Sequence, residues 1–425
     1  MAARWDDPVN EPEPESGFFS GAGPGSRTGC IRATRPPAAP RLSRVASGGV
    51  RYVRDVADRW EDLRALTATL FPGALLEAVE PLAADAAGGD AEKAIGYGEP
   101  LRVTVRTRDG ARRRFVFRTQ RADAFGHDRR ADRVEGALLS YELFNAIPAH
   151  VRALDVGVAR EGGRLLSLAG TGEPYLVTEW AEGALYAEDL RRLARGGTAA
   201  PLDLARAGAL AGYLAALHAE KLGDPAAWRR AVRDLVGHGE GIFGMVDAYP
   251  VDVPAAPPAR LRAIEERCLD WRWRLRERAT RLARTHGDFH PFNIVFRPPD
   301  AGEDGSGFTL LDASRGGKGD PADDVVALSV NYPFFALDHP GAWRALGPLW
   351  RRFWERYLAE TGDAAVLESA PPYLAWRALV LASPRFYPRL SATARDALLA
   401  LAERALDAGR LDLVWVEALF PEPAP

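Results

Sequence analysis

Cysteine is nearly absent from this chain of 425 residues, which contains only Cys30 and Cys268. Two cysteines cannot build a disulfide framework, so we expect a protein of a reducing compartment, the cytoplasm. The N-terminus lacks the apolar segment of a secretory signal. No stretch approaches 18 apolar residues without a charge, so no membrane span is expected. The formal net charge is only -3, so neither nucleic acid nor an anionic membrane is expected as a partner.

Lysine is also scarce. The sequence contains only Lys93, Lys221 and Lys318, and the other 52 of its 55 basic residues are arginines. Biased codon usage is the simplest explanation, and most of these arginines are expected to be surface charge.

Composition divides the chain into three parts. Residues 1–48 contain seven prolines and show no lasting periodicity, so we predict a disordered tail. Residues 49–180 show apolar–polar alternation and the hairpin signal Asp109-Gly110. Residues 181–425 show mainly helical periodicity. We therefore predict an α+β fold with a small β-rich lobe followed by a larger helical lobe.

The same periodicity predicts individual elements. Helices are expected over residues 52–70, 132–146, 204–219, 225–246, 261–284 and 343–360, with further helices towards the end. Strands are expected over residues 101–105, 115–118, 294–296 and 308–311, with a hairpin that pairs 165–166 with 175–178.

The segment with the most chemical content is THGDFHPFNIVF, residues 285–296. Asp288 and Asn293 lie five residues apart in a loop before an apolar strand, and the next strand leads into Asp312. Phosphoryl transfer needs a carboxylate that orients the attacking hydroxyl and accepts its proton, and oxygen ligands for magnesium beside the ATP phosphates. Asp288 can be that base, and Asn293 and Asp312 can be the ligands. Each piece alone could be an ordinary turn, but the ordered set is hard to explain by chance.

The order HGD-x4-N, LLD and GDP-x2-D resembles the catalytic core of aminoglycoside phosphotransferases and choline kinases. The resemblance covers roughly residues 91–330 and implies a bilobal protein-kinase-like fold, in which the β-rich lobe binds nucleotide and the helical lobe carries the catalytic and acceptor-binding residues. It implies transfer of the γ-phosphate of ATP to a hydroxyl of a small molecule, with Mg²⁺ as cofactor. Asp288 would be the catalytic base, and Asn293 and Asp312 would bind the metal.

Further residues take roles by the same resemblance. His286, Asp320 and Asp324 would brace the catalytic loop rather than touch substrate. Asp320, which precedes Pro321, also has the ordinary reading of a turn or a helix cap. His218 is expected to be a packed core residue rather than a ligand.

The phosphate-binding side of the nucleotide site is expected in the β-rich lobe. Gly96 and Gly98 would let backbone N–H groups approach the ATP phosphates, although an ordinary turn is an equally good reading. Val116 and Arg118 share one face of a strand, because side chains alternate with period two. The resemblance implies that Val116 covers adenine and that residue 118 contacts the α- and β-phosphates. The family has lysine there, so Arg118 is a departure.

Three further residues complete the expected nucleotide site. Glu135 would pair with the cation at position 118, but Asp132 and Glu135 also have the spacing of an N-terminal capping box. The backbone near Glu179 and Ala181 resembles the hinge of the family, which would hydrogen-bond adenine.

Two rival functions stay open. The first is a non-catalytic, nucleotide-binding kinase-like protein, which the departure at Arg118 supports. The second is a protein kinase, which the HGD form and the helical insertion after Lys221 oppose. The sequence names neither the phosphate acceptor nor the oligomeric state, and it does not distinguish ATP from GTP.

The cation on the nucleotide phosphates can be identified by substitution. We expect Arg118→Ala to weaken the use of MgATP strongly, because a guanidinium keeps its charge and its fork suits both phosphate and carboxylate. Lys93→Ala is the matched control and should leave MgATP use unchanged. Initial-rate kinetics with varied MgATP measures both effects. The reverse pattern would assign the role to Lys93, and a wild-type chain that binds no ATP would favour the non-catalytic rival.

Overall fold

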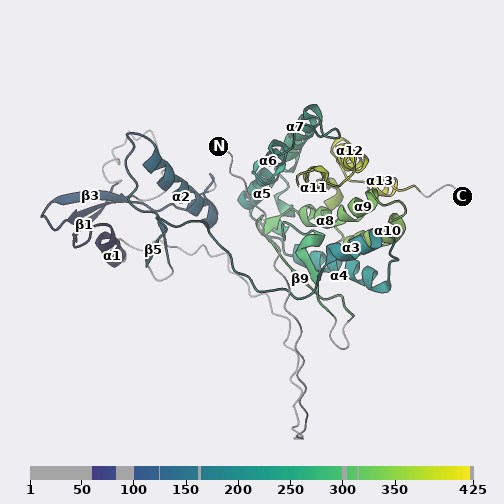
Figure 1. The fold of residues 1–425 in the computed structure, drawn as a ribbon, viewed down its shortest axis with the longest axis horizontal. Coiled ribbons are helices and arrows are strands. Elements are labelled where there is room, and N and C mark those ends of the chain that lie inside the picture. The colour runs from purple at the N-terminus through teal and green to yellow at the C-terminus, as the bar shows by residue number, and fades with distance from the viewer. Residues whose placement is uncertain are drawn as a thin grey trace, which may run out of the picture. The chain divides into compact units, whose positions relative to one another are not determined.

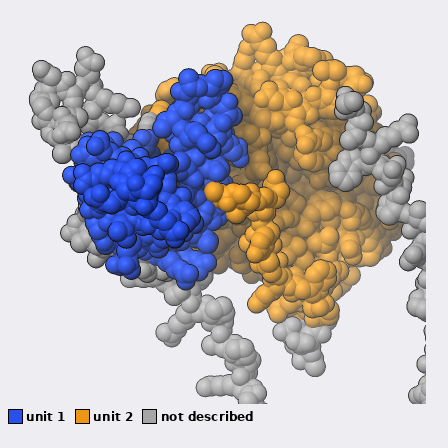
Figure 2. Space-filling view, turned by 60° about the vertical axis from the view of Figure 1, so that its left-hand side comes forward, with its two compact units in different colours: residues 1–121, 137–168 blue, residues 122–136, 169–425 orange. Residues whose placement is uncertain are grey.

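The computed structural model describes residues 60–82, 100–123, 125–160, 164–298, 304–313 and 315–421. The predicted tail, residues 1–48, lies outside them. The chain forms two compact units, coloured separately in Figure 2: residues 1–121 with 137–168, and residues 122–136 with 169–425. Helices and strands are both present, as the α+β prediction requires. The lobe boundary expected after residue 180 stays a prediction.

The first unit contains a three-stranded antiparallel sheet with the order β1-β2-β3. Helix α1 (Trp60–Leu70) precedes the strands β1 (Leu75–Pro81), β2 (Leu101–Arg106) and β3 (Arg112–Phe117). Helix α2 (Arg130–Ala146) and the short strands β4 (Gly157–Ala159) and β5 (Leu165–Ser167) follow (Figure 1). The division between the units falls inside α2, after Gly136.

Alternation along β2 builds the core of this unit. Leu101, Val103 and Val105 are buried and pack with Leu63 of α1, while the residues between them are half-buried. The expected strand over residues 101–105 is confirmed. The Asp109-Gly110 hairpin turn is confirmed too: β2 pairs with β3, and Gly110 has a φ of +79°, which glycine adopts without steric cost.

The predicted hairpin between residues 165–166 and 175–178 is wrong. Strand β5 pairs instead with β4, across a short connection. A partner this close in sequence costs less loop-closure entropy, and Pro174 has no N–H to offer a ladder. Residues 175–177 are not in a strand, and their side chains are between 81% and 91% exposed.

The second unit is mostly helical. Its helices are α3 (Tyr186–Ala194), α4 (Pro201–His218), α5 (Pro225–Gly237), α6 (Ile242–Asp247), α7 (Pro258–Leu275), α8 (Pro321–Ser329), α9 (Asn331–Leu337), α10 (Trp343–Thr361), α11 (Val366–Ala382), α12 (Ala392–Ala408) and α13 (Leu413–Glu417). Its short strands are β6 (Ala184–Leu185), β7 (Ala283–Arg284), β8 (Ile294–Phe296), β9 (Phe308–Leu310) and β10 (Lys318–Gly319). They form two small antiparallel sheets, β6-β8-β9 and β7-β10.

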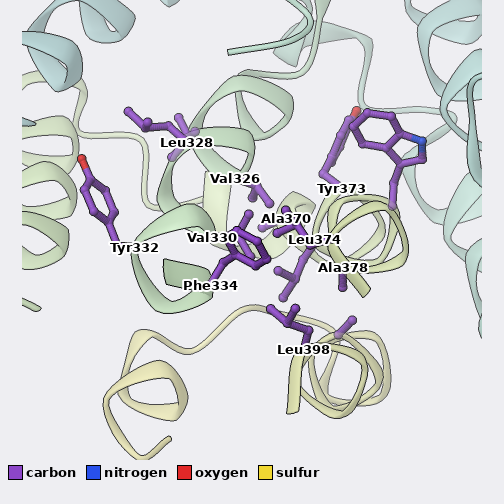
Figure 3. Close-up of a cluster of buried hydrophobic side chains, with 14 of the residues drawn as sticks. Val326, Leu328, Val330, Tyr332, Phe334, Ala370, Tyr373, Leu374, Ala378 and Leu398 are labelled. Carbon is purple, nitrogen blue, oxygen red and sulfur yellow. The ribbon is translucent and has the colours of Figure 1, made fainter. Parts of the chain in front are cut away.

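The core of the second unit runs through most of its helices, and one part of it lies between the C-terminal helices. Figure 3 shows buried side chains of this part, from α8, α9, α11, α12 and the junction of α8 and α9: Val326, Leu328, Val330, Tyr332, Phe334, Ala370, Tyr373, Leu374, Ala378 and Leu398. Burying one large apolar side chain contributes about 1.5–3 kcal/mol. This packing fixes α8 and α11, the two helices whose polar residues reach the site described below.

Two predicted helices are shorter than expected. The segment 225–246 is split into α5 and α6 near Gly241, where a Cβ would lie 2.5 Å from the carbonyl oxygen of Asp234. The segment 261–284 ends as a helix at Leu275, because residues 283–284 pair with β10 instead. In both cases a close backbone approach or a strand partner overrides helical periodicity.

Helix α2 begins two residues earlier than predicted. The carboxylate of Asp132 accepts a hydrogen bond from the backbone N–H of Arg129, 2.7 Å away, and also binds the guanidinium of Arg230 on α5. Asp132 is therefore the third residue of the helix rather than its N-cap, so the alternative reading of a capping box between Asp132 and Glu135 is wrong.

None of the described helices is long and apolar enough to cross a membrane.

Arg230 on α5 binds Asp132 at the start of α2. The contribution of this contact to stability can be tested by substitution. Arg230 is largely buried and binds Asp128, Asp132 and Asp234. Its loss removes the ion-pair partner of Asp128 and Asp132, whereas Asp234 keeps Arg233 and Arg129. We expect Arg230→Ala to lower the free energy of unfolding by about 3–5 kcal/mol. The neighbouring Arg233 binds only the far oxygen of Asp234 and is more exposed, so Arg233→Ala should cost less than about 1 kcal/mol. Urea unfolding measures both, and equal losses would contradict the assignment.

Candidate functional site

The loop of residues 285–293 (loop 285–293) connects β7 to β8 and carries the motif singled out in the sequence. The backbone N–H groups of His286 and Gly287 donate to the two carboxylate oxygens of Asp324, at 2.7 and 2.8 Å. Gly287 has a φ of +84°, a conformation that a residue with a Cβ rarely adopts. The bracing role expected of Asp324 is confirmed by these two hydrogen bonds.

Asp324 lies in the first turn of α8 and is fully buried. Its oxygen Oδ2 also lies 3.2 Å from Nε2 of His218 on α4, whose Nδ1 is 2.9 Å from the hydroxyl of Tyr357 on α10. Burial raises the pKa of Asp324, but the hydrogen bonds from His218 and the loop amides outweigh burial, and the pKa lies below its usual value. His218 is therefore buried as expected, and it has a polar role as well as packing.

Asp320, the N-cap of α8, supports the same region. Its carboxylate accepts two hydrogen bonds from Arg281, at 2.8 and 3.0 Å, and one from the hydroxyl of Ser369 on α11. It also caps α8 through the N–H of Ala322. Both expectations for Asp320 therefore meet: it is a helix cap, and it ties α8 to the segment that leads into loop 285–293.

Asp288 lies at the centre of loop 285–293, with a side chain that is 22% exposed. Its Oδ1 accepts a hydrogen bond from Nη1 of Arg377, 2.7 Å away. Its Oδ2 accepts one from Nδ2 of Asn293 at 3.1 Å and lies 3.3 Å from Nε2 of His290. Burial raises the pKa of Asp288, but His290 and the positive charge of Arg377 outweigh it and hold the pKa well below its usual range. Asp288 is therefore an ionised, precisely held carboxylate.

Arg377 and His290 both contact the carboxylate of Asp288, and the sequence analysis singled out neither of them. His290 lies inside the motif, and its position two residues after Asp288 was a usable signal. The signal for Arg377 was weaker: a single arginine in α11, a helix that is otherwise apolar from Ala370 to Ala382. Its distance of 89 residues from Asp288 hid the contact.

Asn293 and Asp312 lie at the ends of adjacent strands. Ile294 of β8 pairs with Leu310 of β9, and the N–H of Leu311 donates to the carbonyl oxygen of Asn293, 2.9 Å away. Asp312 comes next and has a φ of +49°, an uncommon conformation for a residue with a side chain. Such strain is typical of functional sites. The sheet therefore brings these two residues to one end of the β8–β9 pair.

The donors at this end fit a hard divalent cation. Asn293 uses its Nδ2 to bind Asp288, which leaves the amide oxygen Oδ1 for a cation. Asp312 contributes an exposed carboxylate. Magnesium prefers such oxygen ligands, usually one or two from protein together with water and substrate phosphates.

The residues expected to bind the nucleotide are only partly described. Gly96, Gly98 and Lys93 lie outside the described residues. Val116 is about half exposed on the face of β3 opposite to Phe115 and Phe117, which pack against the core.

Arg118 follows the last residue of β3 and is exposed. Glu135 is an exposed residue of α2 and belongs to the other unit. Glu179 and Ala181 lie in the segment between β5 and β6. Because Arg118 and Glu135 belong to different units, their pairing stays a prediction.

A model of the phosphotransferase enzyme family matches residues 99–355, more than half of the chain. No curated protein matches. The chain resembles three solved structures: an amicoumacin kinase, hAmiN, in complex with AMP-PNP, Ca²⁺ and Ami (15% identity, 84% of this chain, 96% of that chain, TM-score 0.36); the aminoglycoside phosphotransferase APH(3'')-Id of Streptomyces rimosus (19%, 75%, 98%, 0.30); and a microcompartment-associated aminopropanol kinase (15%, 83%, 99%, 0.28). At these scores the three structures add nothing to the family match.

The brace on loop 285–293 can be tested through stability. Asp324→Ala leaves two buried amides and His218 without their acceptor, and we expect a loss of about 3–5 kcal/mol in the free energy of unfolding. The pKa of Asp324 is lowered by folding, so its contribution exists above the unfolded pKa and is lost as the pH falls through the folded one. The difference in the free energy of unfolding between Asp324→Ala and the wild type should therefore become smaller at acidic pH.

The control for this test is Asp304→Ala. Asp304 is exposed and accepts hydrogen bonds only from Ser306 among the described residues, so its loss should cost less than about 0.5 kcal/mol. Denaturant unfolding across a range of pH measures both variants. A pH-independent gap for Asp324→Ala would show that the ionised carboxylate is not what holds the loop.

Proposed function

Because the chain belongs to the phosphotransferase enzyme family, we propose that it transfers the γ-phosphate of ATP to a hydroxyl group of a small molecule, in the manner of aminoglycoside phosphotransferases. The observation that carries this proposal is the arrangement around Asp288, an ionised carboxylate held by Arg377, Asn293 and His290. The proposal includes a bilobal protein-kinase-like arrangement, with residues 49–180 binding nucleotide and residues 181–425 carrying the catalytic and acceptor-binding residues.

In the proposed reaction the acceptor hydroxyl hydrogen-bonds to the carboxylate of Asp288. The hydroxyl oxygen forms a bond to the γ-phosphorus as the bond to the β–γ bridging oxygen breaks, and ADP leaves. The hydroxyl proton passes to Asp288. The low pKa of this carboxylate makes it a weak base, so its main contribution is to orient the nucleophile, as expected for a loose transition state that demands little proton removal before attack.

Asn293 and Asp312 are proposed to hold Mg²⁺, which would neutralise negative charge on the phosphates. Both residues stand at the end of the β8–β9 pair, and Asn293 directly contacts Asp288. This contact links the proposed metal ligand to the proposed base. A change in either residue would therefore disturb the other.

The nucleotide side of the site is proposed from the sequence. Gly96 and Gly98 would lie against the phosphates, Val116 against adenine, Arg118 against the α- and β-phosphates with Glu135 as its partner, and the backbone of Glu179 and Ala181 against the adenine edge. A cytoplasmic location also stays a prediction.

A non-catalytic nucleotide-binding protein is the alternative, and Arg118 in the usual lysine position is the one feature in its favour. The retention of Asp288, Asn293 and Asp312 together favours a working enzyme.

The direct test is an ATP-consumption screen across hydroxylated metabolites and antibiotics, with Asp288→Asn as the paired variant. We expect at least one acceptor to stimulate ADP formation by the wild type. Asp288→Asn should lower turnover by a factor of about 10² to 10⁴ and change MgATP affinity little, because the side chain keeps its shape but loses its charge. Asp304→Asn, an exposed control, should match the wild type. Near-normal turnover by Asp288→Asn would remove Asp288 from the reaction.

The metal ligands can be tested apart from turnover. Asn293→Ala and Asp312→Ala should each raise the magnesium concentration needed for nucleotide binding, since each removes an oxygen ligand. Fluorescent-nucleotide binding in a magnesium titration measures this shift. If both variants follow the wild-type magnesium curve, the two residues do not hold the metal.

A further inference from the structure

Helix α11 contains one arginine, Arg377, in its buried half. Arg377 is 5% exposed, and the residues around it in the helix are apolar. Burying a guanidinium carries a large desolvation cost, and proteins usually offset it with several hydrogen bonds or with a well-matched counter-charge. The partners of Arg377 therefore show what it is for.

Those partners are few. Arg377 makes one hydrogen bond, from Nη1 to Oδ1 of Asp288 at 2.7 Å. Its Nη2 lies 3.9 Å from Asp323, and neither Nε nor Nη2 has a hydrogen-bond partner among the described residues. Replacing both partners of such a buried ion pair by apolar residues is often neutral or stabilising for a fold, so a fold does not need the pair. Stability alone therefore does not account for Arg377.

The guanidinium is nevertheless held in place. It lies over the ring of Trp376, 4.0 Å from the ring centroid, and the guanidinium of Arg315 lies 3.8 Å from the same centroid. The indole N–H of Trp376 donates to the carbonyl oxygen of Glu240, which fixes the ring. Arg315 in turn donates to the carbonyl oxygen of Gly287 and forms a two-pronged pair with Asp323. Arg315 therefore contacts loop 285–293 at Gly287, and Arg377 of α11 contacts the same loop at Asp288.

The contacts of Asp288 identify the acceptor position that stays open. An ionised carboxylate offers about four acceptor positions. Oδ2 is contacted by Asn293 and His290, whereas Oδ1 is contacted only by Arg377 among the described side chains. The open position is therefore on Oδ1, and the side chain is partly exposed to solvent. Rotation of the carboxylate would break the bond to Arg377.

We propose that Arg377 is a positioning residue of the phosphotransfer reaction, which fixes the carboxylate of Asp288 so that the open position on Oδ1 receives the acceptor hydroxyl. This inference rests on the proposed function. Arg377 acts through Asp288 and does not touch ATP. It therefore governs the chemical step rather than nucleotide binding.

The test compares two buried arginines, Arg377→Met and Arg395→Met. Arg395 on α12 is 6% exposed and donates to the carbonyl oxygens of Ala382 and Tyr387 rather than to a carboxylate. The assay is ADP formation from MgATP with the acceptor found by the screen. We expect kcat of Arg377→Met to fall about 100-fold, the typical effect of misplacing a reacting group by about 1 Å. KM for MgATP should stay unchanged, and Arg395→Met should keep wild-type kcat even if it melts earlier.

Chemical rescue separates positioning from packing. Guanidinium ion at millimolar concentration, well below denaturing levels, should restore part of the turnover of Arg377→Ala, because it can occupy the vacated position beside Asp288. Arg377→Lys, which keeps the charge but loses the planar fork, should recover only part of the activity. Wild-type kcat in Arg377→Met would overturn the proposal, as would a loss of kcat that guanidinium does not restore in a folded Arg377→Ala.

A third measurement keeps this inference distinct from the proposed function. If no acceptor in the screen stimulates ADP formation by the wild type, the proposed function fails. The contact between Arg377 and Asp288 is then tested by the melting temperatures of Arg377→Met, Asp288→Asn and the double variant. We expect the shift in the double variant to be smaller than the sum of the single shifts, because each change removes the same contact. Additive shifts would overturn the role of Arg377 as well.

Discussion

The carboxylate of Asp324 is the interaction on which the site depends. It accepts the two backbone N–H groups of His286 and Gly287 and meets His218, all inside the helical unit. A loop that turns tightly at a glycine leaves amides without partners in a strand or a helix, and unpaired amides in the interior are costly. A buried carboxylate at the start of α8 satisfies both amides at once. The position of Asp288, the next residue, follows from this anchoring.

Arginine–aspartate pairing recurs around this anchor. Arg281 with Asp320 and Arg377 with Asp288 join helices of the C-terminal half to the flank of loop 285–293 or to the loop itself. Arg315 pairs with Asp323 of α8 and also donates to the carbonyl oxygen of Gly287 in the loop. The planar fork of arginine can bind two oxygens or stack on a ring, which suits a crowded and partly dry site. In a chain with three lysines, the abundance of arginine therefore has structural consequences.

Local patterns predicted the elements whose partners are near in sequence. The hairpin at Asp109-Gly110, strand β2 and the strand after Asn293 could all be placed because alternation and turn chemistry act over a few residues. The failures came where distant residues compete. Residues 175–178 had the composition of a strand, but β5 pairs with β4. The helix expected to continue to residue 284 stops at Leu275, since β10 pairs with residues 283–284.

The sequence by itself determined which chemical groups are available: the carboxylate of Asp288 and the oxygen donors of Asn293 and Asp312. The order of these residues along the chain indicated the phosphotransferase family. Only the tertiary structure decided how that carboxylate is held. Arg377 is 89 residues from Asp288, and in the sequence it is one of 52 arginines. The packing of α11 against α8 buries it and directs it to one oxygen of Asp288. Burial and orientation are properties of the packed helices, and a linear pattern does not contain them.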